Sequence, residues 1–130
     1  MANAVLVDSS FFIRRFRERL DPLLELATHA GNWDLATCGM VKLEVCRGLK
    51  PALMRARYEA AFAVMLYAPT NFSAWERAAH LAWELDRVGN TIPAPDLVIA
   101  ACALAIDAPV LTFDRHFQLV PGLQVLDRLN

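Results

Sequence analysis

The stretch Ile92–Phe117, IPAPDLVIAACALAIDAPVLTFDRHF, predicts a buried helix followed directly by a buried strand. Pro93 and Pro95 are favoured only in the first helical turn, so Asp96 is expected in that turn. The run from Leu97 to Ile106 is almost wholly apolar, which is typical of a helix packed on a sheet. The run is too short to cross a membrane.

A short strand follows this helix and ends at a second aspartate. Val110, Leu111 and Phe113 are β-prone and show no polar alternation, as expected for a strand buried on both faces of a parallel sheet. Asp114 closes the run. Because ligands of parallel sheets bind outside the carboxyl ends of the strands, Asp114 stands where a functional site is expected.

The N-terminal segment repeats this arrangement. Ala4–Val7 is a short apolar run, Asp8 closes it, and Ser9 and Ser10 lead into a basic helix. Asp8 therefore also stands at the carboxyl end of a predicted strand. An aspartate here is often a helix N-cap, but Ser9 or Ser10 could cap the helix instead and leave Asp8 free for chemistry.

A helix is expected over Cys38–Leu49, and it carries an acid on its apolar side. Glu44 lies within the apolar stripe of this helix. A carboxylate on a buried helix face is costly unless it is paired or bound to a cation. Pairing with Arg47 or Lys50 is the alternative to a functional role. The stripe consists of Met40, Val41, Val45 and Leu49.

The remaining segments alternate between helices and short strands. Ser73 is expected to cap one of these helices, with Glu76 completing a capping box. The pattern predicts an α/β/α sandwich with a mostly parallel central sheet. No repeat, linker or low-complexity segment divides the chain, so one domain over residues 1–130 is expected. Further helices are expected over 21–30, 51–65 and 74–88, and further strands over 33–37, 66–69 and 123–126.

Charge and cysteine content narrow the class of protein. The chain has 13 basic and 14 acidic side chains, so if Asp8, Glu44, Asp96 and Asp114 form a site, 13 bases face 10 other acids. This balance suits a basic surface around an acidic pocket. The three cysteines show no CxxC spacing, which gives no support to a zinc or redox motif and favours buried thiols in a reducing cytoplasm. No signal peptide is visible.

Four acids stand out by position: Asp8 and Asp114 at strand ends, Asp96 at a helix start and Glu44 on an apolar stripe. If the two strands are neighbours, all four can meet in one crevice. Clustered carboxylates repel one another unless cations neutralise them. Since no histidine or cysteine joins the set, Mg²⁺ or Mn²⁺ is expected before Zn²⁺. Such a site can activate water for phosphodiester cleavage.

The sequence around these acids resembles that of PIN-domain ribonucleases, and within them VapC-type toxins of bacterial toxin–antitoxin pairs. The resemblance implies a Rossmann-like sandwich, metal-dependent RNA endonuclease activity, a homodimer and a small VapB-like antitoxin that blocks the site. It carries Asp8, Glu44, Asp96 and Asp114 over as metal-binding acids. The matching stretches are VLVDSSFFI, VKLEVCRGL, PDLVIAACAL and LTFDRHFQLVPGLQVL.

One departure from the family pattern concerns His116. Many members carry a further acid two residues after the position of Asp114, and here that residue is His116. The number of metal ions, one or two, therefore stays open. Ser10 matches a hydroxyl position that family members often place next to the first acid.

Basic residues near the acids are candidates for contacts with RNA phosphates, which position a substrate without reading its bases. For each of them the alternative is a solvated helix face. The candidates for RNA contact, the hydroxyl included, are Ser10, Arg14, Arg15, Arg17, Arg47, Lys50 and Arg115.

Other protein classes fit less well. A haloacid dehalogenase-type phosphatase needs a second aspartate two residues after the first, where this chain has Ser10. A response-regulator receiver needs a further acid pair and a late lysine, and neither is found. The remaining alternative is a non-catalytic PIN-like module that binds protein or RNA. Loss of a site acid would mark such a module, and all four acids are present. The target RNA does not follow from the sequence.

Overall fold

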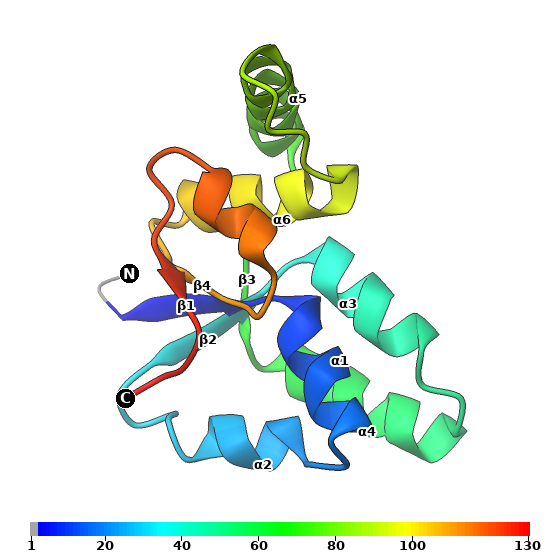
Figure 1. The fold of residues 1–130 in the computed structure, drawn as a ribbon. Coiled ribbons are helices and arrows are strands. Elements are labelled where there is room, and N and C mark those ends of the chain that lie inside the picture. Colours follow the sequence, from blue (N-terminus) through cyan, green and yellow to red (C-terminus); the bar gives the residue numbers. More distant parts are fainter. Residues whose placement is uncertain (1–2) are drawn as a thin grey trace.

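A five-stranded sheet, in which every pair of neighbouring strands is parallel, forms the centre of the molecule (Figure 1). The structure is a computed structural model and describes residues 3–130. The strand order is β3-β2-β1-β4-β5. The strands are β1 (Ala4–Val7), β2 (Asp34–Thr37), β3 (Leu66–Tyr67), β4 (Val110–Leu111) and β5 (Val125–Leu126).

Helices cover both faces of this sheet. In Figure 1, α5 and α6 lie on one side, and α1, α2 and α4 lie on the other. This arrangement confirms the predicted α/β/α sandwich. The helices are α1 (Ser9–Arg17), α2 (Pro22–Ala27), α3 (Gly39–Arg47), α4 (Ala52–Ala63), α5 (Phe72–Arg87) and α6 (Ala94–Ala105), and a 3₁₀ helix, η1, spans Arg115–Leu119.

The two strands that were expected to carry site aspartates are neighbours. β1 pairs with β4 in parallel, with Leu6 opposite Val110, and all residues of both strands are buried. The backbone N–H of Asp8 continues this pairing and donates to Leu111 O at 2.9 Å. The residues that follow β1 and β4 therefore emerge side by side at the carboxyl edge of the sheet.

The helix α6 is buried as its sequence predicts. Residues 97–103 are all buried, between the sheet and α5. The helix begins in the proline-rich turn, with Pro93 as N-cap residue, and Asp96 lies in its first turn. The long apolar run therefore fixes both the central packing of the fold and the position of one candidate acid.

The N-cap and the packing face of α5 differ from the prediction. Asn71, and not Ser73, caps α5, because Asn71 Oδ1 accepts a hydrogen bond from the N–H of Ala74 at 3.0 Å. The spacing of Trp75 and Ala79 along the expected helix 74–88 predicts that both pack inward, but both are exposed. Small side chains on the buried face let α5 lie close to α6, and this turns the indoles outward. The buried residues of α5 are Ala74, Ala78, Leu81 and Leu85.

Smaller differences concern α2, α4 and the cysteines. α2 ends at Ala27, three residues before the expected end, and turns connect it to β2. The helical spacing within 51–65 predicts Leu53 on the apolar face of α4, but Leu53 is exposed. All three cysteines are free, and Cys38 and Cys102 are buried while Cys46 is partly exposed. No helix within residues 3–130 is long and apolar enough to span a membrane.

Candidate active site

A crevice of about 870 Å³ opens at the carboxyl edge of the sheet, and Asp8, Glu44, Asp96 and Asp114 all line it. The four acids come from four separate segments: the end of β1, the helix α3, the first turn of α6 and the loop after β4. The convergence expected from the sequence is therefore present in the fold. The other lining residues are Ser9, Ser10, Ile13, Arg14, Arg17, Glu18, Phe113 and Arg115.

Asp8 is the N-cap of α1 and is also part of the crevice. Only 2% of the residue is exposed, and Asp8 Oδ2 accepts from the N–H of Ser10 at 3.3 Å. Of the two alternatives for the cap of α1, the structure shows Asp8 itself, because Ser9 and Ser10 both lie inside the first turn. The cap fixes the orientation of the carboxylate, so the structural and functional roles of Asp8 are compatible.

Thr112 connects the first and last acids, and the sequence interpretation missed it. Its hydroxyl donates to Asp8 Oδ2 at 2.8 Å and accepts from the N–H of Asp114 at 2.9 Å. Because the Thr112 proton is directed at Asp8, the Ser10 hydroxyl must donate to Thr112 Oγ1, 2.9 Å away. In the sequence, the only signal is that Thr112, a polar residue, directly follows the apolar Leu111 and precedes Asp114 by two positions. The structure shows that Thr112 is buried.

Glu44 reaches the same edge of the sheet through Ser9. The Ser9 hydroxyl donates to Glu44 Oε1 at 2.9 Å and lies 3.4 Å from Asp8 Oδ1. Neither Arg47 nor Lys50 forms an ion pair with Glu44 in the part of the chain that the structure describes. The alternative to a functional role, a salt bridge from Glu44 to a basic residue near the end of its own helix, therefore does not explain the position of Glu44.

Asp96 and Asp114 meet at His116. The imidazole Nδ1 lies 3.1 Å from Asp96 Oδ2 and 3.0 Å from Asp114 Oδ1. One potential ligand atom from each of the three residues falls within 4.8 Å of the other two. Asp114 also caps η1 by accepting from the N–H of His116 at 2.9 Å.

The raised pKa of Asp96 indicates that a further negative charge in the site is unfavourable. Burial raises the pKa of Asp96 to about 6, the hydrogen bond to His116 opposes this shift, and the charges of Asp114 and Asp8 add to it. Within residues 3–130, none of the four acids pairs with a lysine or an arginine. Clustered carboxylate oxygens without such partners suit a hard divalent cation.

The predicted RNA-contacting residues are divided between the crevice and other places. Ser10, Arg14, Arg17 and Arg115 line the crevice. Arg15 instead forms ion pairs with Glu18 and Glu25, both at 2.8 Å. Arg47 lines a separate cavity beside α4, and Lys50 is not among the crevice residues.

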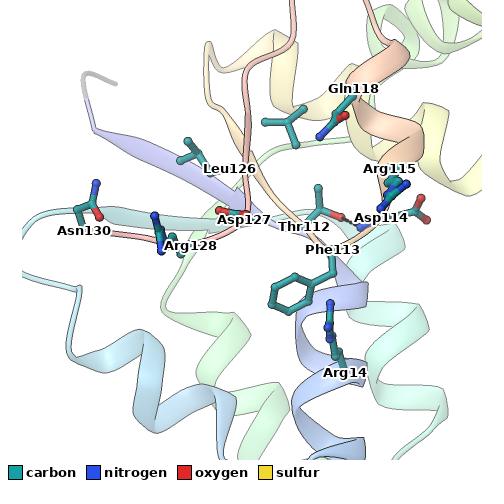
Figure 2. A pocket seen from close by; sticks show the side chains of 11 residues that line it. Arg14, Thr112, Phe113, Asp114, Arg115, Gln118, Leu126, Asp127, Arg128 and Asn130 are labelled. Carbon is teal, nitrogen blue, oxygen red and sulfur yellow. Dashed lines mark hydrogen bonds between the residues drawn. The ribbon is translucent and has the colours of Figure 1, made fainter.

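A second cavity of about 520 Å³ adjoins the crevice, with Arg14, Phe113, Asp114 and Arg115 lining both (Figure 2). The guanidinium of Arg14 lies 4.6 Å from the centre of the Phe113 ring. Arg128 lines the second cavity from the C-terminal segment, beside Asp127, and the sequence interpretation overlooked it because it is not close in sequence to any of the four candidate acids. Basic groups therefore surround the acids on this side of the molecule.

Comparison with known protein families identifies the class of protein to which this fold and its acid-lined crevice belong. A family model of the PIN domain matches residues 5–123. The chain therefore belongs to the PIN domain family. A comparison with curated proteins found no significant match.

Several solved structures share this fold over nearly the whole chain. VapBC2 from Rickettsia felis, bound to a promoter DNA fragment, is 21% identical with a TM-score of 0.76, over 94% of this chain and 96% of that chain. VapBC-5 from Mycobacterium tuberculosis is 26% identical with a TM-score of 0.64, over 95% and 97%. VapC20 from Mycobacterium tuberculosis, a Sarcin-Ricin loop cleaving toxin, is 15% identical with a TM-score of 0.67, over 94% and 98%.

Proposed function

We propose that this protein is a metal-dependent RNA endonuclease and the toxin of a toxin–antitoxin pair. The observation that carries the proposal is the convergence of Asp8, Glu44, Asp96 and Asp114 on one crevice of a PIN domain. The solved structures with this fold include toxin–antitoxin complexes and one toxin described as cleaving the Sarcin-Ricin loop. These neighbours support the assignment of both the reaction and the biological role.

Nucleases of this fold generally depend on a divalent metal ion, and the carboxylate-rich donor set suits Mg²⁺ or Mn²⁺. Asp8, Asp96 and Asp114 would hold the ion, and Glu44 would complete the acidic lining. Their charges have no lysine or arginine partner in the described chain, so a divalent cation would relieve their mutual repulsion. When bound, the ion supplies Lewis-acid stabilisation of the charge that develops on the phosphate.

The chain's own residues position the substrate and the water. Arg14, Arg17 and Arg115 border the acids and can hold the RNA phosphates on either side of the scissile bond. Ser9 donates to Glu44 Oε1, which fixes the carboxylate and leaves its second oxygen to accept a hydrogen bond from the attacking water. Glu44 is thereby suited to orient that water or to take up its proton.

The RNA path would extend into the second cavity of Figure 2, since the two cavities share their arginine-lined border. Arg128 would bind a phosphate in this second cavity, whereas Arg17 lines only the first crevice. Such contacts set the register of the strand and carry no base preference of their own. The identity of the RNA therefore depends on its shape and on further contacts.

Two protein partners belong to the proposal. A VapB-like antitoxin would cover the acidic crevice and inhibit RNA cleavage in the cytoplasm.

A homodimer would form through the outer face of α5, where Phe72, Trp75 and Trp83 are 79%, 52% and 60% exposed. Exposed aromatic side chains grouped on one helix are typical of an interface. Light scattering should therefore report a dimer, and Trp83→Glu should shift it to a monomer.

The central experiment compares wild type with Asp96→Asn on total RNA. Cleavage by wild type should require Mg²⁺ or Mn²⁺, stop with EDTA and fall by about a hundredfold or more in the variant. Asp107→Asn is the matched control, because Asp107 lies at the opposite end of α6 in a left-handed conformation that asparagine tolerates. Equal cleavage by wild type and Asp96→Asn, or cleavage that EDTA does not affect, would reject the proposed mechanism, whereas RNA binding by the wild type without any cleavage would favour a non-catalytic binding module.

A further inference from the structure

His116 lies between two of the four candidate acids. Its Nδ1 atom lies 3.1 Å from Asp96 Oδ2 and 3.0 Å from Asp114 Oδ1, so the ring bridges the start of α6 and the loop after β4. The nitrogen and the two carboxylate oxygens converge on the same small volume. The ring therefore belongs to the site by geometry, although the composition of the acid set alone suggested only oxygen ligands.

We propose that His116 Nδ1 is a ligand of the divalent ion together with Asp96 and Asp114, and that this nitrogen makes the site select Mn²⁺ over Mg²⁺. The inference rests on the proposed function, since it concerns the same metal centre. It adds a ligand and an ion preference that the four acids do not specify.

The distances between the donor atoms suit ligation of one ion. Ligand atoms about 2.1 Å from an octahedral ion lie about 3.0 Å apart when they occupy adjacent positions. The two separations from His116 Nδ1, 3.1 and 3.0 Å, correspond to such adjacent positions. Two of the three separations between these donor atoms therefore already match those around a bound ion.

The ring is held in place by its own backbone. The N–H of His116 donates to Asp114 Oδ1 at 2.9 Å, so one residue of the cluster anchors the next. Phe117, the following residue of η1, is fully buried and fixes this short helix against the core. The His116 side chain is 43% exposed and contacts two of the candidate acids, whereas that of His80 is 72% exposed on α5 and pairs with Glu84 at 2.9 Å.

The ion preference follows from ligand chemistry. Mg²⁺ favours oxygen ligands and gives up its waters reluctantly, so exchanging an oxygen for an imidazole nitrogen weakens its binding. First-row transition ions accept imidazole more readily, and Mn²⁺ also accepts the carboxylates that make up the rest of the site. A site with one nitrogen among carboxylate oxygens therefore shifts the balance toward Mn²⁺.

Binding measurements on the protein stripped with EDTA test the inference independently of cleavage. Titration calorimetry should show tighter binding of Mn²⁺ than of Mg²⁺, and His116→Asp should reduce the ratio of the two affinities about tenfold. Pulsed electron paramagnetic resonance of the wild type loaded with Mn²⁺ should show coupling to a nitrogen nucleus. His116→Gln should abolish this coupling, whereas His80→Gln, the matched control, should retain it.

The possible outcomes separate this inference from the proposed function. If Mn²⁺ binds without nitrogen coupling, or if the affinity ratio is the same in wild type and His116→Asp, the inference is overturned while metal-dependent cleavage still stands. If Asp96→Asn cleaves RNA as well as wild type, the proposed function fails. Absence of any Mn²⁺ binding by the wild type would overturn both.

Discussion

The hydroxyl of Thr112 donates a hydrogen bond to Asp8 Oδ2 at 2.8 Å and so joins residues 104 positions apart in the sequence. This hydrogen bond connects the carboxyl ends of β1 and β4 beside the candidate acids. Since Thr112 Oγ1 also accepts from the backbone N–H of Asp114, one buried hydroxyl contacts the Asp8 carboxylate and the backbone that carries Asp114. Its removal should therefore affect both stability and the site.

Thr112→Val keeps the shape of the side chain and removes the hydroxyl. The variant leaves Asp8 and the N–H of Asp114 short of a partner, so the free energy of unfolding should fall by about 1–2 kcal/mol. Urea denaturation measures this loss. Thr28→Val, which removes an exposed hydroxyl at the end of α2, should change stability by less than about 0.5 kcal/mol. Similar losses in both variants would contradict the role assigned to Thr112.

Ser9→Ala tests how Glu44 is positioned. Without the Ser9 hydroxyl, Glu44 loses the hydrogen bond that fixes its carboxylate, so kcat for RNA cleavage should fall by about 10- to 100-fold with little change in KM. Single-turnover kinetics at saturating RNA would measure this loss. Ser73→Ala is the control, because Ser73 is exposed and does not cap α5. A change in KM alone would indicate that Ser9 serves RNA binding instead.

The raised pKa of Asp96 predicts a dependence of stability on pH. Its folded-state pKa of about 6 exceeds the ordinary value of 3.8, so the stabilising contribution of the protonated acid is complete below pH 3.8 and is lost as the pH rises through 6. In EDTA, Asp96→Asn should therefore be more stable than wild type at pH 8, by about 1–3 kcal/mol, and the difference should shrink toward pH 4. Urea denaturation at several pH values measures it.

The control for this prediction is Asp107→Asn, which should show no such trend. Added Mn²⁺ should reverse the order at pH 8, because the ion stabilises the folded wild type by mass action and the variant binds it more weakly. A stability difference that is the same at pH 4 and pH 8 would show that charge at Asp96 is not its cause.

Arg128→Gln tests the extension of the RNA path into the second cavity. Measured in the Asp96→Asn background so that RNA stays intact, affinity should fall and the slope of log K against log salt should decrease in magnitude by about 1. Arg87→Gln, at the end of α5, should leave both quantities unchanged. An unchanged salt slope in Arg128→Gln would place the RNA elsewhere.

The elements that position the acids were predictable because their signals are local. The apolar runs before Asp8 and Asp114 and the prolines before Asp96 each determine a strand end or a helix start with little help from the rest of the chain. The sequence did not predict that β1 and β4 are neighbours, since pairing between strands that are distant in the chain leaves no periodic pattern. The convergence of the four acids therefore depended on assuming that the two strands pair.

The parts that were missed depend on contacts across the fold. Thr112 reaches Asp8 only when β4 lies beside β1, and His116 meets Asp96 only when η1 packs near α6. On α5, both Asn71 and Ser73 are good capping residues, and packing of small alanines against α6 decides between them. Such choices are settled by tertiary packing and not by local propensity.

The strand order also makes the candidate site depend on the order of synthesis. β1 ends at Val7 and its neighbour β4 begins only at Val110, with Asp114 just beyond it. Until β4 is synthesised, β1 has one unpaired edge, and neither Thr112 nor Asp114 is present. Under the proposed function, a chain truncated before residue 110 should therefore fail to cleave RNA.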